Sequence, residues 1–193
     1  MKREVSLRVH AIEPRSRANG PGTRTVIWVQ GCTLGCPGCF NPATWPAAGG
    51  QEMEIAAIVD AVRAAGSEGV TVSGGEPFEQ PEALLALVTA LAGTSIIVFS
   101  GFTRGEIERQ PLGPAVLERI DVLVDGRYVD KRRVASGLRG SANQVVHLLT
   151  PRHRMADIES TPVGEVIIGP DGEVRVSGVD PPGVPGVPGV IDN

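Results

Sequence analysis

Three cysteines lie within eight residues of one another, and the chain contains no others. They are Cys32, Cys36 and Cys39, in the segment CTLGCPGC. Thiolates are the natural ligands of iron–sulfur clusters. Three thiolates can hold three irons of a four-iron cluster and leave the fourth iron open to a substrate or cofactor. The spacing therefore indicates a chemical site more than a structural one.

Two structural interpretations of the cysteines are disfavoured. A disulfide would leave one of the three cysteines unpaired, and the chain starts without a secretory signal pattern. A structural zinc ion usually takes four protein ligands from two close pairs. Here there is one triplet, and the candidate fourth ligands are distant in the sequence, at His10, His147 and His153. We interpret His147 as a structural residue.

A second chemical motif is the tetrapeptide Gly74-Gly75-Glu76-Pro77, which follows a predicted buried strand over residues 69–73. Two glycines allow the backbone to approach a ligand closely and permit unusual dihedral angles. Exposed peptide groups and the Glu76 carboxylate can then bind a primary ammonium group. A plain turn from strand to helix would use the same residues, so the motif alone leaves both interpretations open.

The residues around the cysteines make a family resemblance specific. The segment GPGTR at residues 20–24 leads into the apolar run 26–29, and Phe40-Asn41-Pro42 follows Cys39. With the pattern C-x3-C-x2-C, the chain resembles the radical S-adenosylmethionine superfamily. Within it, the chain is similar to the small activating enzymes of glycyl-radical enzymes, above all to the activating proteins of anaerobic ribonucleotide reductase. The resemblance covers most of residues 10–149.

The resemblance implies a function and its cofactors. Cys32, Cys36 and Cys39 would hold a [4Fe-4S] cluster, and S-adenosylmethionine would chelate the open iron. Residues 74–77 would bind the amino group of S-adenosylmethionine. Reductive cleavage then gives methionine and a 5′-deoxyadenosyl radical. In the activating enzymes, this radical abstracts a hydrogen atom from a glycine of a partner enzyme.

Five further residues are candidates for cofactor contacts. Ser100 lies in a turn after a predicted strand, and Asp125 follows the predicted strand 120–124, although Asp-Gly at this position also forms ordinary turns. Arg139, Ser141 and Asn143 belong to the segment RGSANQ, which resembles a segment of the reductase activators. Their side chains can bind the carboxylate or ribose of the cofactor, or the backbone of a partner; the sequence leaves these alternatives open.

Strands and helices alternate along the chain, which predicts an α/β fold with a parallel sheet and right-handed crossovers. We expect an edge-like strand at 4–12, a loop at 13–24, and a buried strand at 25–29. The later strands are expected at 69–73, 95–99, 120–124 and 145–149. Helices are expected at 52–65, ending near Gly66, at 81–92, and from a capping box at Thr103. The resemblance implies an incomplete parallel α/β barrel, open on one side.

Three regions are expected along the chain. Residues 1–160 form the radical S-adenosylmethionine core domain. Residues 161–179 form a β-hairpin, because the β-rich runs 165–168 and 173–176 flank Gly-Pro-Asp-Gly. Residues 180–193 are rich in proline and glycine and form a flexible tail.

The composition limits which cellular compartment and which classes of partner are expected. The chain has 193 residues and a net charge of −4, which gives no electrostatic reason to expect nucleic-acid binding. No apolar run is long enough for a bilayer, and no signal peptide is recognised, so we expect a cytoplasmic protein without a membrane partner. The expected partners are a glycyl-radical enzyme, or another protein or peptide, and an electron donor such as flavodoxin or ferredoxin.

Two alternative functions are considered. The same radical chemistry can modify a peptide or a small molecule. A non-enzymatic iron–sulfur electron carrier or sensor is the other alternative. A carrier usually has four protein ligands for each cluster, and it would not need the Gly-Gly-Glu-Pro motif.

Overall fold

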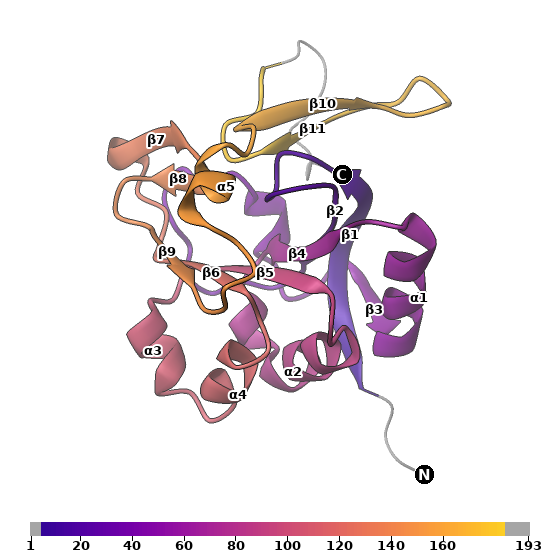
Figure 1. The fold of residues 1–193 in the computed structure, drawn as a ribbon, viewed down its shortest axis with the longest axis vertical. Helices are drawn as coiled ribbons and strands as arrows, with labels where there is room; N and C mark the ends of the chain where they lie inside the picture. The colour runs from indigo at the N-terminus through magenta and orange to yellow at the C-terminus, as the bar shows by residue number, and fades with distance from the viewer. Residues whose placement is uncertain (1–4, 184–193) are drawn as a thin grey trace.

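The computed structural model describes residues 5–183 and is built around one seven-stranded sheet (Figure 1). The strand order is β3-β1-β2-β4-β5-β6-β9. The strands are β1 (Ser6–Ser16), β2 (Arg24–Val29), β3 (Gln51–Glu54), β4 (Gly69–Gly74), β5 (Ser95–Ser100), β6 (Val122–Asp125) and β9 (Val145–Leu148). The predicted α/β class is confirmed.

The sheet is mixed, which corrects the expectation of a parallel sheet. The central strands β2, β4, β5 and β6 are parallel to one another. However, β1 pairs antiparallel with both β2 and β3, and β9 pairs antiparallel with β6. A parallel pair needs a long crossover. The chain makes such crossovers between the central strands. It reverses direction at the sides of the sheet, through residues 17–23 between β1 and β2 and through the longer segment 126–144 between β6 and β9.

Three local predictions near the N-terminus are wrong. Strand β1 is not at the edge of the sheet, because β3 pairs with its outer side. It also continues to Ser16, where a loop was expected. Residues 51–54 form β3 instead of the first turn of the helix, which begins at Ile55. Pairing with residues 6–9, far away in the sequence, therefore overrides the local helical pattern at this point.

Five α-helices are present in the described part of the chain: α1 (Ile55–Ala65), α2 (Pro81–Ala90), α3 (Arg104–Glu108), α4 (Gly113–Leu117) and α5 (Met155–Glu159). Gly66 ends α1 in a left-handed conformation, as predicted. The capping box of Thr103 and Glu106 at the start of α3 is also confirmed. The short helices α4 and α5 were not predicted.

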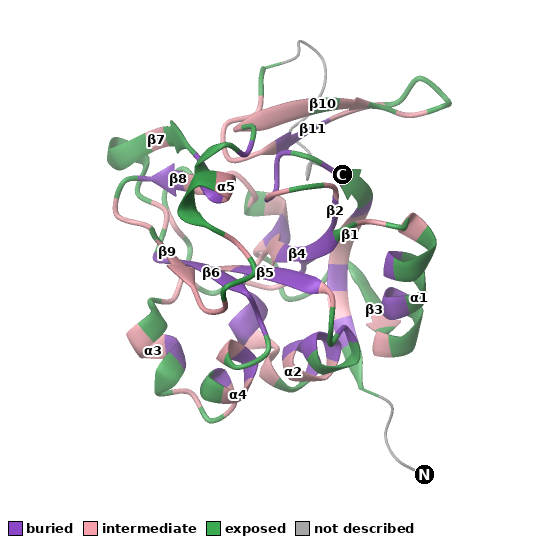
Figure 2. Cartoon of the chain, viewed as in Figure 1, coloured by how far each residue is buried: buried purple, intermediate pink, exposed green. Residues whose placement is uncertain are grey.

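The two faces of the sheet have different coverings. Helices α1, α2 and α4 pack on one face, where Val29, Val72 and Val98 belong to the main hydrophobic core. Side chains alternate between faces along a strand. On the other face, Val122 and Val124 pack against Leu138, from the loop between two short strands. In Figure 2, the central strands are buried, whereas much of the outer surface of α1 is exposed.

Small elements cover the second face. They are β7 (Arg133–Ser136), β8 (Arg139–Ser141), α5, and the hairpin of β10 (Gly164–Ile168) with β11 (Val174–Gly178). The hairpin was predicted, and it lies across the top of the molecule in Figure 1. Of the predicted tail, residues 184–193 lie outside the described residues. At its start, the Asp180 N–H donates to the Val163 carbonyl at 2.8 Å.

The amino end of the parallel strands is closed by Arg24, whose side chain is fully buried. Its guanidinium donates to the Val70 carbonyl at 2.6 Å, to the Ser95 carbonyl at 2.9 Å and to the Thr71 hydroxyl at 2.8 Å. Burial lowers the pKa of Arg24 to about 10. Hydrogen bonds therefore compensate a buried cation at this end of the sheet.

Within residues 5–183, no helix has the length and apolar character required to cross a membrane.

Candidate active site

The cysteine loop begins directly after β2, at the carboxyl end of the parallel strands. Backbone hydrogen bonds fix its start, because the Gly31 N–H donates to the Thr44 carbonyl at 2.7 Å and the Cys32 N–H donates to Trp45 at 3.1 Å. Gly35 and Gly38 have φ angles of 57° and 75°, which other residues rarely adopt. The loop can therefore turn twice within a few residues and present its three thiols to one cavity.

Glu79 is the last residue of the neighbouring 3-10 helix η2 (Pro77–Glu79), and its side chain contacts the cysteine loop. Its carboxylate accepts hydrogen bonds from the Thr33 N–H at 3.0 Å and from the Thr33 hydroxyl at 2.6 Å. Thr33 lies between two cysteines, so this contact ties the loop to the segment after Gly-Gly-Glu-Pro. The role of Glu79 was not predicted, since nothing near it in the sequence indicates its partner.

The Gly-Gly-Glu turn packs against the start of the cysteine loop. The Gly75 N–H donates to the Val29 carbonyl at 2.8 Å, and the Glu76 N–H donates to the Gly31 carbonyl at 2.9 Å. A Cβ atom on Gly75 would lie 2.3 Å from the Gly31 oxygen. Close packing between the two motifs therefore requires glycine here, whatever ligand the turn also binds. Pro77 begins η2, is buried and does not line the cavity.

The Glu76 side chain links the end of β4 to the end of β5 by hydrogen bonds. It is 1% exposed. One oxygen accepts from the Phe78 N–H and the Ser100 hydroxyl, both at 2.9 Å, and the other accepts from the Gly101 N–H at 2.7 Å. Burial raises the pKa of Glu76 to about 7, and these hydrogen bonds oppose the shift. Glu76 thus positions the turn, and Ser100 is its direct partner.

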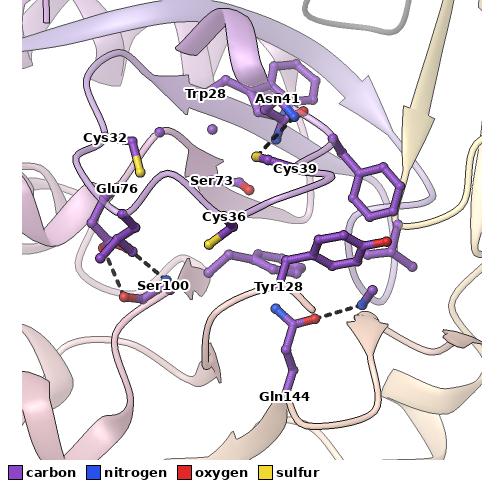
Figure 3. Close-up of a pocket in the computed structure, with 18 of the residues that line it drawn as sticks. Trp28, Cys32, Cys36, Cys39, Asn41, Ser73, Glu76, Ser100, Tyr128 and Gln144 are labelled. Carbon is purple, nitrogen blue, oxygen red and sulfur yellow. Dashed lines mark hydrogen bonds between the residues drawn. The ribbon is translucent and has the colours of Figure 1, made fainter. Parts of the chain in front are cut away.

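A cavity of about 270 Å³ lies between these elements. It is lined by seven of the predicted site residues: Cys32, Cys36, Cys39, Gly74, Gly75, Glu76 and Ser100. In Figure 3, the Cys36 sulfur lies between Ser100 and Tyr128, Cys32 lies near Glu76, and Cys39 lies beside Asn41. The two sequence motifs are therefore brought together at one site.

The donor set fits an iron–sulfur cluster. The three cysteines are free thiols that line the same cavity. Burial raises the pKa of Cys32 and of Cys36, so their thiolate forms require a nearby positive charge or a metal centre. Within residues 5–183, no three His, Cys, Asp or Glu side chains are grouped to hold a single metal ion. In a four-iron cluster each cysteine binds a different iron, so its three ligands need not converge on one point.

Four other predicted site residues lie outside the cavity lining. Asp125 accepts a hydrogen bond from the Arg104 N–H and lies 3.2 Å from the His147 ring. The Ser141 hydroxyl accepts from the Val129 N–H at 3.1 Å. The remaining two are Arg139, at the start of β8, and Asn143, whose amide donates to the Arg127 carbonyl at 2.7 Å.

Several residues that line the cavity were missed. The Gln144 amide oxygen accepts from the Gly140 N–H at 2.8 Å, and its nitrogen donates to the Gly126 carbonyl at 3.1 Å (Figure 3). The rings of Phe40 and Tyr128 pack with their centroids 4.8 Å apart. Gln144 belongs to the segment RGSANQ and Phe40 lies beside Cys39, so the sequence offered a signal for these two residues. The C-terminal hairpin also reaches the cavity, and no local pattern indicated that contact.

Comparison with known proteins identifies the family. Residues 18–147 match the family described as a 4Fe-4S single cluster domain. An anaerobic ribonucleoside-triphosphate reductase-activating protein of Salmonella typhimurium is 38% identical over 155 residues, which cover 74% of this chain and 99% of the relative. The chain belongs to the family of these activating proteins. The corresponding protein of Vibrio cholerae is also 38% identical, over 73% of this chain and 97% of its own length.

A second kind of activating enzyme is related to the same region. The pyruvate formate-lyase-activating enzyme of Clostridium pasteurianum is 36% identical over 135 residues, which cover 64% of this chain and 53% of the relative. Members of this family of activating proteins are radical S-adenosylmethionine enzymes. The cofactors of the present chain are accordingly a [4Fe-4S] cluster and S-adenosylmethionine.

Proposed function

We propose that this chain generates a glycyl radical on a partner enzyme, and that the partner is an anaerobic ribonucleoside-triphosphate reductase. The observation that carries the proposal is the shared cavity of the cysteine loop and the Gly-Gly-Glu turn. The identity of 38% over nearly the whole Salmonella activating protein supports the choice of partner. An iron–sulfur carrier would not need a turn that can bind an amino group beside its cluster.

Each part of the site has a task in this proposal. Cys32, Cys36 and Cys39 hold the cluster. When bound, the cluster supplies the electron that cleaves the sulfonium carbon–sulfur bond of S-adenosylmethionine, giving methionine and a 5′-deoxyadenosyl radical. Residues 74–76 form the wall that receives the amino group of S-adenosylmethionine. Glu76 acts by binding and positioning, because hydrogen-atom abstraction transfers no proton to a base.

The parallel strands at the centre of the sheet and its open edges support the interpretation as an incomplete barrel. Its edge strands β3 and β9 do not pair with each other among the described residues. We propose that a segment of the partner enters between the open side and the cysteine loop, close to Phe40 and Tyr128. The proposed setting is a reducing cytoplasm, where free thiols and the cluster persist. A flavodoxin or ferredoxin is the proposed electron donor.

The test is an anaerobic activity measurement on the full chain. The protein is reconstituted with iron and sulfide and given dithionite and S-adenosylmethionine, and 5′-deoxyadenosine is quantified. Cys36→Ala removes one proposed ligand, so product formation should fall at least about 100-fold, since even outer-shell partners of metal sites cost 10- to 100-fold. Pro37→Ala is the matched control, because Pro37 is exposed in the same loop and should leave the rate unchanged.

The partner is tested by adding the reductase of the same genome. A glycyl radical on that reductase, detected by electron paramagnetic resonance, is expected with the native chain and with Pro37→Ala. Undiminished product from Cys36→Ala would contradict the ligand assignment. Product formation without any radical on the reductase would contradict the proposed partner while leaving the cofactor chemistry intact.

A further inference from the structure

The end of the C-terminal hairpin forms one side of the cavity. We call residues 177–181 the crossing segment. Ser177, Gly178, Val179 and Pro181 line the same cavity as the three cysteines. In Figure 1, the hairpin lies over the second face of the sheet, opposite helices α1 and α2. The crossing segment therefore contributes a wall to the site that the two sequence motifs do not provide.

Buried polar contacts fix the first end of the crossing segment. The Asn19 amide nitrogen donates to the Ser177 hydroxyl at 2.6 Å and to the Ser16 hydroxyl at 2.7 Å. Asn19 is 7% exposed and Ser177 is 2% exposed. The Glu165 carboxylate adds a contact with the Arg17 N–H at 2.9 Å. An amide with two N–H donors suits two hydroxyl acceptors, so this end is attached specifically to the end of β1.

An ion pair fixes the second end. The Asp180 carboxylate contacts the Arg133 guanidinium from β7, and the Asp180 N–H donates to the Val163 carbonyl at 2.8 Å. The same guanidinium lies 5.1 Å from the centre of the Phe40 ring, next to Cys39. The crossing segment thus runs over the second face of the sheet, from Asn19, just after β1, to Arg133 of β7, and ends beside the cysteine loop.

The crossing segment lies outside the region that matches the family model. The family match ends at residue 147, whereas the hairpin begins at Gly164. A match that covers 99% of the Salmonella protein takes up only 74% of this chain. The shared part supplies both cofactor motifs, so the added wall is not needed for the reaction common to the family. The added wall is therefore expected to serve a property particular to this chain, such as the choice of partner.

The chemistry of the cavity restricts what can lie against this wall. No arginine, lysine or histidine is among the described residues that line it, and Glu76 is its one carboxylate. Apart from the carboxylate of S-adenosylmethionine, which the open iron would hold, an anionic ligand would therefore find no cationic side chain here. Other residues of the lining are aromatic or amide-bearing, including Trp28, Phe40 and Asn41. Such a lining suits an uncharged peptide segment, whose backbone amides can bond to hydroxyl and amide groups.

We propose that the crossing segment recognises an extended, uncharged segment of the partner protein and thereby selects the partner of this chain. The inference rests on the proposed function, because it assigns a role in hydrogen abstraction from a protein. In that step the carbon–hydrogen bond of the partner's glycine breaks, the hydrogen atom joins the 5′-deoxyadenosyl radical, and the unpaired electron stays on the glycine.

Two tryptophan substitutions, one in the crossing segment and one in the hairpin, separate this role from a structural one. Val179→Trp places bulk on the cavity wall. Ile168→Trp makes the same kind of change on β10, where Ile168 is 71% exposed and does not line the cavity. The probe is the anaerobic reductase of the same genome, with its glycines deuterated at Cα. Two quantities are measured: 5′-deoxyadenosine formed without the reductase, and deuterium transferred to 5′-deoxyadenosine in its presence.

We expect Val179→Trp to lower deuterium transfer at least about tenfold, because small displacements of a reacting group cost large factors in rate. Cleavage without the reductase should fall by a much smaller factor than deuterium transfer, and Ile168→Trp should change neither quantity. Native deuterium transfer by Val179→Trp would overturn the inference. An equal loss of cleavage would also overturn it, since the segment would then belong to the cofactor site.

Asp180→Ala provides a milder test that keeps the hairpin sequence in the cavity unchanged. It removes the contact with Arg133 at the surface, so it should lower deuterium transfer about threefold and leave cleavage intact. Unchanged transfer in this variant would contradict the inference even if Val179→Trp failed to fold. If the native chain transferred no deuterium, the proposed function would fail and the inference with it; normal native transfer combined with insensitive variants would remove the inference alone.

Discussion

The two ends of the parallel strands β2, β4 and β5 are built in opposite ways. At the amino end, Arg24 fills the space between the strands and donates to Thr71, to Ser95 and to strand carbonyls. At the carboxyl end, glycines at positions 74 and 75 and the short loop of cysteines leave a cavity of about 270 Å³. One end is closed by a charged side chain, and the other end is kept open beside three thiols.

The difference shows how one sheet separates stability from chemistry. The polar groups around Arg24 satisfy one another, so this end requires nothing from outside the chain. At the other end, burial disfavours the thiolate forms of Cys32 and Cys36, and a metal centre is needed to reverse that preference. Substitutions at the amino end should therefore affect mainly stability, and those at the carboxyl end mainly activity.

The strongest test of this comparison is Arg24→Ala. The variant leaves the Val70 and Ser95 carbonyls without their buried donor and opens a cavity, so the free energy of unfolding should fall by about 3 to 5 kcal/mol. Urea unfolding of the cluster-free protein measures this loss. Arg63→Ala is the control, because Arg63 is 73% exposed and its ion pair with Asp60 spans 3.7 Å; it should cost less than about 0.5 kcal/mol.

The same measurement on Cys36→Ala completes the comparison. Cys36 is only half-buried in a loop, so the cluster-free variant should lose less than about 1 kcal/mol. If Arg24→Ala were no more destabilising than Cys36→Ala, the proposed separation between the two ends would be wrong.

Gly75→Ala probes the packing of the two motifs at the open end. A Cβ atom at position 75 would lie 2.3 Å from the Gly31 oxygen, so the cysteine loop must shift. We expect a loss of about 1 to 3 kcal/mol in the free energy of unfolding. We also expect a fall of at least about tenfold in 5′-deoxyadenosine formation. Urea unfolding and the anaerobic assay measure the two effects.

Gly105→Ala is the matched control for that substitution. Gly105 lies in α3, where the nearest atom to an added Cβ is the Arg109 side chain at 3.7 Å, an ordinary contact. Alanine is the better helix former, so stability should be unchanged or rise by up to about 1 kcal/mol. Equal behaviour of the two alanine variants would mean that the cysteine loop accommodates position 75 without moving.

The sequence predicted the parts of the fold that depend on local patterns. The buried strands β2, β4 and β5 and the helices α1 and α2 were found because apolar periodicity and stop signals such as Gly66 lie within each element. The three cysteines and Gly-Gly-Glu were recognised as chemical motifs in the same way. Their meeting in one cavity follows from parallel strands that end at the same edge of the sheet.

The remaining features depend on contacts between distant segments. Asn19 and Ser177 are separated by 158 positions, so no local pattern indicates that the hairpin reaches the cavity. Residues 51–54 look like the first turn of a helix until β1 pairs with them. The predicted segment RGSANQ reaches the cavity, but the sequence could not show that Gln144, rather than Asn143, lines it.

His153 offers the smallest and most specific test of the closed end. Its ring nitrogen lies 2.7 Å from the Ser95 hydroxyl, beside Arg24. Burial and the neighbouring Arg24 and Arg152 lower the pKa of His153 below 6.5, although Asp121 and Asp157 act in the opposite direction. Below about pH 6.5 the unfolded chain therefore binds more protons at this residue than the folded chain does, and the free energy of unfolding falls as the pH falls.

His153→Gln should remove this contribution, because glutamine can keep a hydrogen bond to Ser95 but does not titrate. We expect the free energy of unfolding of the native chain to decrease more steeply than that of the variant between about pH 7 and about pH 5. Urea unfolding of both cluster-free proteins across this range measures the difference. Parallel pH profiles would show that His153 is protonated equally in the folded and unfolded states. The charge of Arg24 would then have no effect on the pKa of His153.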